Sequence, residues 1–430
     1  MATEFFHGIE LAVLLATLLA VVGIRLKPVL AGILTAAGLC AFAWKSSRSP
    51  GIDLHGFWQA GQNVWVGISP YDMSDYPGVP VPLNPPTAFP LFALLAILPL
   101  QTCLVVWLVL SGLACLLLVW ISERALRAEY AARGESQLKL DWPTIGLLTA
   151  AVSLSFSARY GLDLGQLAIL TAAMLISAVL ARASGRWLTA AICLAFATVK
   201  IGTMFPFLLL FLRPRYWKTL VAFTGICVAL VLATTAPGAI PTRLTEMGGN
   251  IAKFDKSVNN YEYENPSNVE MFGIDHLLYR LGLRDRSQIR ICQLLVLAGL
   301  GLWVAYEASP WGRLPSGVAV SLVALYAELF LYHRVYDAIL LALPLVEAAR
   351  LASATKGRVR ILAAVAGVAV LGVMYLQVGT LRSFVPIAQS GGLRGRAVEV
   401  FVLPYATWLT LLAMGCFGML KRNRSLHLGW

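Results

Sequence analysis

The chain has 430 residues, of which 58% are hydrophobic and only 13% are charged, about half the charged fraction of an average globular protein. This composition excludes a soluble enzyme fold such as a Rossmann domain or a TIM barrel. The formal net charge of +12 comes from 34 Lys and Arg against 22 Asp and Glu. Because the cations cluster beside apolar runs, positive-inside topology and contacts with membrane lipids explain them, and we expect no nucleic-acid partner.

Continuous apolar runs recur along the whole chain, and a membrane-spanning helix needs about 20 apolar residues. Their continuity disfavours an outer-membrane β-barrel, whose strands alternate apolar and polar residues. We predict an all-α polytopic membrane protein, a single integral membrane domain over residues 1–430 with about 13 transmembrane helices. The predicted spans are 9–25, 28–44, 103–122, 143–158, 167–182, 187–199, 201–212, 217–235, 291–308, 316–332, 336–350, 360–378 and 400–420.

The positive-inside rule orients these spans. Short cation-rich connections, such as Arg124–Lys139, are predicted to be cytoplasmic, which places the N-terminus outside and the C-terminus inside. The first apolar run lacks a basic leader and a small-residue cleavage site, so it is interpreted as a retained helix. Segment 86–100 is short and contains Pro90 and Pro99, and we predict a re-entrant or interfacial helix there. Segments 187–199 and 201–212 are either two short spans or one broken helix.

Three long segments remain on the outer side, at about 45–85, 236–290 and 379–399, and loops of that length in a compact protein are usually functional. The seven cysteines show no CxxC spacing, so neither a disulfide framework nor a zinc site is expected. Asp53, Asp72 and Asp75 are not spaced as a metal pair. We therefore expect no essential metal and no other cofactor.

The first outer loop carries aromatic residues at helical spacing, which predicts an amphipathic interfacial helix over 53–66. Asp53 would lie near the N-terminus of this helix. The helix dipole there keeps a carboxylate ionised, which is the form that a general base needs. The alternative is that Asp53 only caps the helix.

Five cationic or titratable side chains lie at or near the predicted outer membrane face and are candidates for binding a phosphate: Arg159, Lys200, Arg280, His333 and Arg334. Apolar residues flank Lys200 on both sides, where a charge is costly unless it is paired or hydrated. Its alternative role is to snorkel to the interface. The alternative for His333 and Arg334 is a solvated helix end.

Several motifs, in order, resemble the polyprenol-phosphate-mannose-dependent mannosyltransferases of glycosyltransferase family 87, which belong to the GT-C class. The resemblance covers roughly residues 45 to 345 and rests on order and spacing rather than on any single motif. The motifs are Asp53 with Phe57-Trp58-Gln59-Ala60, Gly67 with Pro70-Tyr71-Asp72, the proline-led segment from Pro85 to Pro99, Gly165-Gln166, Lys200 with Pro206, Arg213 and Arg215, and Tyr332-His333 with Tyr336-Asp337.

The resemblance implies an inverting membrane glycosyltransferase in which Asp53 accepts the proton of an acceptor hydroxyl. The donor would be a polyprenyl-phosphate hexose, with mannose the first choice, and the acceptor a glycolipid or a cell-envelope glycan. The enzyme would lie in a bacterial-type inner membrane with its active site on the extracytoplasmic side. Substrate contacts are expected from His55, Trp58, Gln166, Tyr261 and Asn265, although the loop that holds the last two also has the composition of a solvated segment.

A transporter or flippase of lipid-linked saccharides is the main alternative function. Such a protein places paired ionisable residues near the middle of the membrane, on broken helices. This chain instead concentrates Asp53, His55 and the candidate cations toward one face, which favours an enzyme. A non-catalytic scaffold is disfavoured by the presence of Asp53.

Overall fold

The computed structural model describes residues 2–72, 74, 82–135, 138–256, 271–330, 333–376 and 378–420. Tyr261 and Asn265 lie outside these ranges. The described chain is helical apart from two strands of two residues each, β1 (Met271–Phe272) and β2 (His333–Arg334), which pair antiparallel. The all-α prediction is therefore confirmed.

The α-helices of the described ranges follow in chain order. They are α1 (Ala2–Val21), α2 (Pro28–Ser46), α3 (Ile52–Trp65), α4 (Phe89–Leu95), α5 (Leu100–Ala132), α6 (Trp142–Leu154), α7 (Phe156–Leu164), α8 (Ala168–Ala183), α9 (Trp187–Ala197), α10 (Ile201–Met204), α11 (Trp217–Leu232), α12 (Ile240–Lys256), α13 (Ile274–Leu281), α14 (Arg286–Ala308), α15 (Ser316–Leu329), α16 (Ala342–Ala354), α17 (Gly357–Tyr375), α18 (Val378–Arg382), α19 (Val385–Gln389), α20 (Gly392–Ala397) and α21 (Tyr405–Gly418).

Six helical segments of the described chain are long and apolar enough to cross a membrane, and up to eight if each of two bent pairs is one span. The six are α2, α5, the broken segment 187–211, the segment 214–232, α14 and α17. Shorter apolar helices, including α8 and α15, pack among them. Neighbouring helices surround these short helices. Every residue of α15, for example, is buried.

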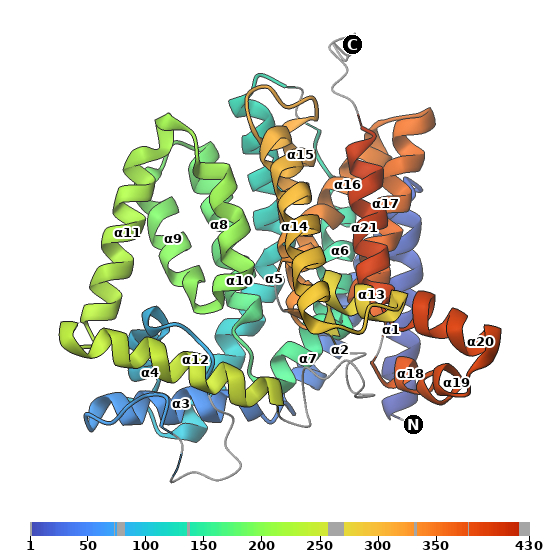
Figure 1. Cartoon of the computed structure of the whole chain (residues 1–430). Helices are drawn as coiled ribbons and strands as arrows, with labels where there is room; N and C mark the ends of the chain where they lie inside the picture. Colours follow the sequence, from blue (N-terminus) through green and yellow to red (C-terminus); the bar gives the residue numbers. More distant parts are fainter. Residues whose placement is uncertain are drawn as a thin grey trace.

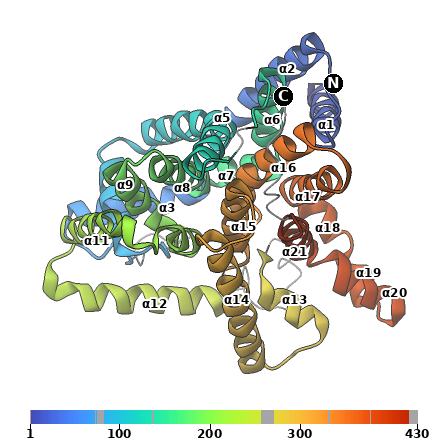
Figure 2. The same ribbon diagram turned by 90° about the horizontal axis from the view of Figure 1, so that it is seen from above.

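The long helices stand side by side, and the shorter polar helices gather at one end of the molecule (Figure 1). Helices α3, α12, α13 and α18 to α20 lie at that end together with the N-terminus, and the described chain ends at the opposite side. Seen from above, α8, α9 and α11 form one group, and α1, α16, α17 and α21 form another, with α5 and α15 between them (Figure 2). We refer to the end that carries α3 and α12 as the α3 end.

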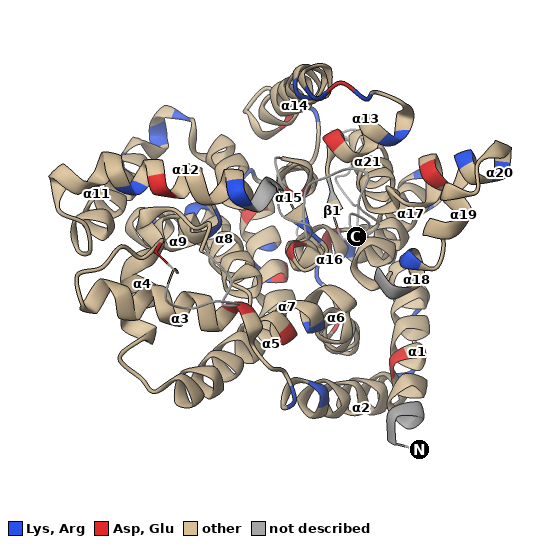
Figure 3. Ribbon diagram, turned by 60° about the horizontal axis from the view of Figure 1, so that its bottom comes forward, with Lys and Arg blue, Asp and Glu red and all other residues tan. Residues whose placement is uncertain are grey.

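The helix predicted over 53–66 is present as α3, at residues 52–65, and it lies across the α3 end rather than along the bundle. Helix α12 lies in a similar orientation. Figure 3 turns this end toward the viewer and shows charged residues on α12 and α20. Helices α12 and α20 thus expose polar side chains at the end of an apolar bundle, as interfacial helices do.

Two helix breaks shape the interior. Helices α6 and α7 meet at a bend of 48°, close to the end of the span predicted at 143–158. Ser155 causes this break, because it leaves the helical conformation and its side chain caps α7 by accepting a hydrogen bond from the Ala158 N–H at 3.2 Å. Segment 187–211 forms one broken helix, which is one of the two predicted alternatives; the break falls at residues 198–200.

Candidate active site

Asp53 lies in the first turn of α3, and Gly51 is the N-cap residue of that helix. The proposal that Asp53 caps α3 is wrong, since the helix begins with no side-chain cap. Gly51 starts the helix at φ 64°, a left-handed conformation that glycine adopts without strain. A Cβ at this position would also collide with the side chain of Leu104. The Asp53 carboxylate is consequently free for another role.

Helix α7 ends beside the start of α3 in a Schellman motif. Gly165, at φ 71°, donates its N–H to the Leu162 carbonyl at 2.9 Å, and Gln166 donates its own to the Gly161 carbonyl at 2.8 Å. A Cβ on Gly165 would stand 2.7 Å from the Cβ of Leu54, so only glycine allows this approach. The motif therefore brings Gln166 directly against α3.

The Gln166 side-chain amide donates a hydrogen bond to the Asp53 carboxylate. Burial raises the pKa of Asp53 above its usual value, and the Gln166 hydrogen bond and the positive charges of Arg334 and Lys200 oppose that shift. The net direction is upward. Asp53 is thus a partly desolvated carboxylate with more basicity than an ordinary aspartate, held in one orientation by an amide donor.

Lys200 occupies the break between α9 and α10, at the end of a short 3₁₀ turn (Thr198–Lys200). The break frees the carbonyl of Val199, which accepts a hydrogen bond from the Asn84 side chain at 2.7 Å. Because of this break, Lys200 leaves the apolar helix and turns into the interior. Its ammonium group pairs with Asp337 and lies 4.5 Å from the centre of the Tyr336 ring.

Asp337 connects the cations of the site. Its carboxylate pairs with Lys200, lies 3.4 Å from His333 Nδ1, and accepts a hydrogen bond from the Arg334 backbone N–H at 3.3 Å. The Phe330 carbonyl is 2.9 Å from the other ring nitrogen of His333. A buried carboxylate with several partners holds them in fixed positions. Asp337 is therefore a positioning residue for the Lys200 ammonium.

The two-residue ladder sets the position of the His333 segment, because Phe272 pairs with His333 and Met271 with Arg334. The strand β1 belongs to segment 236–290. The Gly273 N–H that follows it is anchored to the Thr407 hydroxyl at 3.1 Å. Segment 236–290, strand β2 and α21 are thereby held together.

The structure links five of the predicted site residues: Gln166 donates a hydrogen bond to Asp53, and the charges of Lys200 and Arg334 lower the pKa of Asp53. His333 belongs to the same group through Asp337. This arrangement has one basic carboxylate, Asp53, and two permanent cations, Lys200 and Arg334, of which Lys200 is also paired with the Asp337 carboxylate. It can remove a proton from a hydroxyl while neutralising the negative charge that develops on a phosphate.

Other predicted site residues lie elsewhere. Arg159 pairs with Glu10 at 3.0 Å, and Arg280 lies 3.9 Å from Glu399. The indole N–H of Trp58 donates to the Leu98 carbonyl at 2.8 Å, away from Asp53, and His55 is exposed on α3. Tyr261 and Asn265 are not among the described residues.

Three residues beside the site were not predicted to be site residues: Tyr336 and Asp337, which the sequence analysis named only within a family motif, and Glu328. Asp337 could have been found from its spacing, since it stands four residues after His333. Glu328 is fully buried, and its two carboxylate oxygens have no hydrogen-bond partner in the described part of the chain. No sequence pattern indicates that it lies close enough to Lys200 and Asp337 to interact with their charges.

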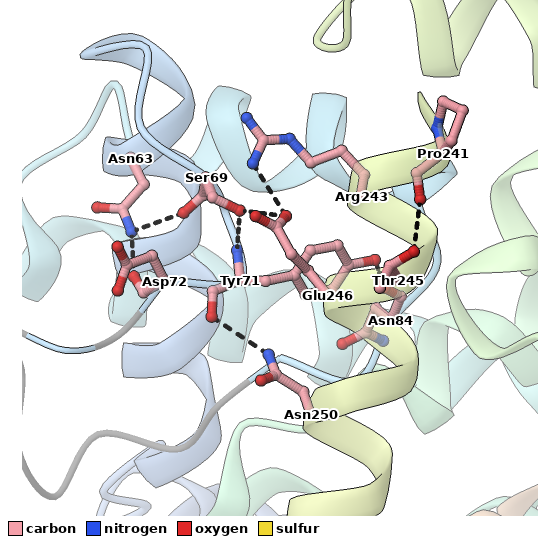
Figure 4. A network of polar contacts seen from close by, with 10 residues as sticks. All are labelled: Asn63, Ser69, Tyr71, Asp72, Asn84, Pro241, Arg243, Thr245, Glu246 and Asn250. Atoms are coloured by element: carbon pink, nitrogen blue, oxygen red, sulfur yellow. Dashed lines mark hydrogen bonds and ion pairs between the residues drawn. The ribbon is translucent and has the colours of Figure 1, made fainter. Parts of the chain in front are cut away.

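A polar network attaches α12 to the loop that follows α3 (Figure 4). Ser69 donates its hydroxyl to Glu246 at 2.7 Å, and Asn250 donates to the Tyr71 carbonyl at 3.2 Å. Tyr71 in turn donates its hydroxyl to the Asn84 carbonyl at 2.7 Å. Asn84 also bonds the carbonyl of Val199, so the network reaches from α12 to the residue before Lys200.

Within the described ranges, no three His, Cys, Asp or Glu side chains cluster in a way that could hold a metal ion. All seven cysteines are free thiols, most of them buried.

Comparison with known proteins gives one family. The family model of glycosyltransferase family 87 matches residues 83–332, more than half of the chain. The matched range includes Gln166 and Lys200 and ends immediately before His333, whereas Asp53 precedes it. No curated protein matches the chain.

Proposed function

The chain belongs to glycosyltransferase family 87, and from that premise we propose that it transfers a hexose, mannose first, from a polyprenyl-phosphate sugar. It is an all-α polytopic membrane glycosyltransferase. We propose a GT-C architecture and an acceptor that is a lipid-linked or cell-envelope glycan. The reaction would take place at the α3 end, on the extracytoplasmic side of a bacterial-type inner membrane. The observation that carries this proposal is the Asp53 carboxylate, which accepts a hydrogen bond from Gln166 and whose pKa is lowered by the charges of Lys200 and Arg334 against the effect of burial.

The proposed reaction is a single inverting displacement. Asp53 accepts the proton of the acceptor hydroxyl while that oxygen attacks the anomeric carbon, and the bond between this carbon and the lipid phosphate breaks. The phosphate leaves with the electron pair of that bond. A β-linked donor gives an α-linked product. One carboxylate suffices, because a phosphate is already a weakly basic leaving group and needs counter-charge more than a proton.

Lys200 and Arg334 supply that counter-charge. The charges of both side chains lower the pKa of Asp53, the proposed base, so both act on the charge of the site at which the acceptor would react. Asp337 holds Lys200, and the β1–β2 ladder holds Arg334. Cations fixed before the reaction stabilise a developing charge without reorganising, which is the main source of electrostatic catalysis.

The donor class is tested by giving the purified protein either polyprenyl-phosphate mannose or a nucleotide-activated mannose. The expected result is product from the lipid-linked donor alone, in the presence of a chelator. Product from the nucleotide sugar alone would overturn the donor class. Dependence of the lipid-linked reaction on an added divalent ion would overturn the metal-free mechanism.

The sidedness can be measured by cysteine labelling in intact cells, in a background without accessible native cysteines. We expect an impermeant maleimide to label Thr242→Cys on α12 and not Ala132→Cys at the end of α5. Both positions are exposed, so a difference in labelling reports the side of the membrane on which each one lies. The reverse pattern would place Asp53 and its site in the cytoplasm and would contradict the extracytoplasmic reaction.

The pH dependence of kcat/KM should follow the protonation of Asp53. Its pKa is raised, and only the deprotonated form is a base, so kcat/KM should fall as the pH drops through a value above that of an ordinary aspartate. Gln166→Leu removes a hydrogen bond that stabilises the carboxylate, so the acidic limb should move to higher pH. Gln62→Leu removes an amide on the same end of the molecule that bonds the Ala96 carbonyl, and it should leave the limb in place. An unmoved limb in Gln166→Leu would separate Asp53 from the profile.

A further inference from the structure

A cavity of about 320 Å³ lies between the first turns of α1, the end of α2 and helix α7. Most of its wall comes from residues before 83, outside the range that the family model matches. We call it the α1–α7 cavity. The charged and titratable residues of its lining are His7, Lys45, Arg48, Arg159 and Asp163, and Trp44 lies among them.

The wall of the α1–α7 cavity has an excess of positive charge. Lys45 and Arg159 both pair with one carboxylate, Glu10, which lies behind the lining. Asp163 accepts a hydrogen bond from the Ser49 hydroxyl at 2.7 Å. The cations Lys45, Arg48 and Arg159 thus face two carboxylates, and one positive charge is left uncompensated when His7 is neutral. A singly charged anion would balance it.

Arg48 is the cation best placed to meet such an anion. It is exposed, and its guanidinium lies 4.0 Å from the centre of the Trp44 ring, which orients it over the cavity wall. The described residues give it no acidic partner within ion-pair distance. An oriented guanidinium with free N–H groups is suited to bind phosphate oxygens through paired hydrogen bonds.

The surface next to the cavity is suited to acyl chains. His7, Leu11 and Leu15 follow one another at intervals of four along α1, so they lie on one face of the helix. The side chains of Leu11 and Leu15 are 58% and 53% exposed. An apolar stripe therefore leads away from the cavity along a helix of the bundle. This combination fits an amphiphile better than a free inorganic anion.

The α1–α7 cavity also adjoins the reaction site. The Asp163 carbonyl accepts the Gly51 N–H at 3.0 Å, two residues before Asp53. On the other side, the Tyr160 ring lies 6.1 Å from the Tyr336 ring, which contacts Lys200. Helix α7 is thus a shared wall between the cavity and the site.

We propose that the α1–α7 cavity binds the phosphodiester headgroup of a lipid, with Arg48, Lys45 and Arg159 on the phosphate and the acyl chains along Leu11 and Leu15. This phosphate is distinct from the one that leaves during transfer. Two sources have the required chemistry: a membrane phospholipid that stays bound, and an acceptor that is itself a phospholipid glycan. The second source rests on the proposed function.

Measuring which lipids stay bound to the protein tests the proposed lipid site and requires no enzymatic turnover. Native mass spectrometry of the full chain would compare added phosphatidylglycerol with phosphatidylcholine, whose headgroup has no net charge. We expect preferential binding of phosphatidylglycerol, and affinity lower by about tenfold in Arg48→Gln, since one charge-assisted contact is lost. The matched control is Arg124→Gln, because Arg124 is also exposed and stacks on a tryptophan four residues earlier, at 4.8 Å from the Trp120 ring.

Two results would overturn the proposal: equal binding of both lipids by the wild-type protein, or wild-type binding of phosphatidylglycerol by Arg48→Gln. The double variant Arg48→Gln/Arg159→Gln should weaken binding further, but the single variant decides the question if the double one fails to fold. Because this assay uses no donor, its outcome stands even if the polyprenyl-phosphate donor proves wrong.

Kinetics then separate the two sources. If the cavity holds the acceptor, Arg48→Gln should raise KM about tenfold for an acceptor with a phosphodiester and leave KM unchanged for an alkyl mannoside. If it holds a separate phospholipid, lipid retention should fall while both KM values stay the same. Each pattern supports the binding site and assigns its occupant.

Discussion

Asp53→Asn should reduce turnover by at least about 10²-fold, the usual loss when a general base is removed, while the protein keeps its fold and its affinity for the donor. The amide is nearly isosteric with the carboxylate, and its oxygen can still accept the hydrogen bond from Gln166. It cannot take a proton from the acceptor. The measurement is single-turnover transfer with saturating donor, together with donor binding and thermal unfolding.

The control for Asp53→Asn is Asp285→Asn. Asp285 does what Asp53 does not: its carboxylate caps a helix, α14, by accepting the Gln288 N–H at 2.8 Å. Asparagine is an equally good cap, so this variant should be fully active and stable. A well-folded Asp53→Asn protein with near-normal transfer would show that the Asp53 carboxylate is structural and that the base lies elsewhere.

Local pattern was enough to predict α3 and to draw attention to Asp53, because aromatic residues at helical spacing define a helix without any tertiary information. The alternative that Asp53 caps α3 was wrong. The helix begins at Ile52, one residue before the predicted start, because Gly51 caps it in a left-handed backbone conformation that spacing alone does not reveal. The role of Asp53 therefore depends on what packs against it, which is Gln166 at the end of α7.

The sequence pattern could not predict which residues pair with one another when they lie far apart along the chain. The partner of Lys200 is Asp337, and the ladder that holds Arg334 has only two residues in each strand, too few for a periodic signal. Arg159 shows the converse. It was expected beside the donor phosphate, yet Glu10 pairs with it from α1. An acidic residue inside an apolar run needs a partner, so Glu10 was the one available sign of this pairing.

The role of Lys200 can be separated from its ion pair. Lys200→Ala should lower kcat/KM for the donor by at least about 10²-fold, because the leaving phosphate loses a fixed counter-charge. The same variant leaves Asp337 buried without its cation, which is destabilising in itself. Lower activity of the single variant would therefore not distinguish catalysis from folding.

The neutral double variant Lys200→Met/Asp337→Asn makes the distinction. Replacing both members of a buried pair by uncharged groups of similar size removes the unpaired carboxylate, so thermal stability should recover toward that of the wild type. Donor kcat/KM should remain as low as in Lys200→Ala, since the counter-charge is still missing. The buried pair Arg182–Glu129, at 2.6 Å, is the matched control: Arg182→Met/Glu129→Gln should leave donor use unchanged. If activity returns along with stability in Lys200→Met/Asp337→Asn, then Lys200 only maintains the fold, and Arg334 would have to neutralise the phosphate alone.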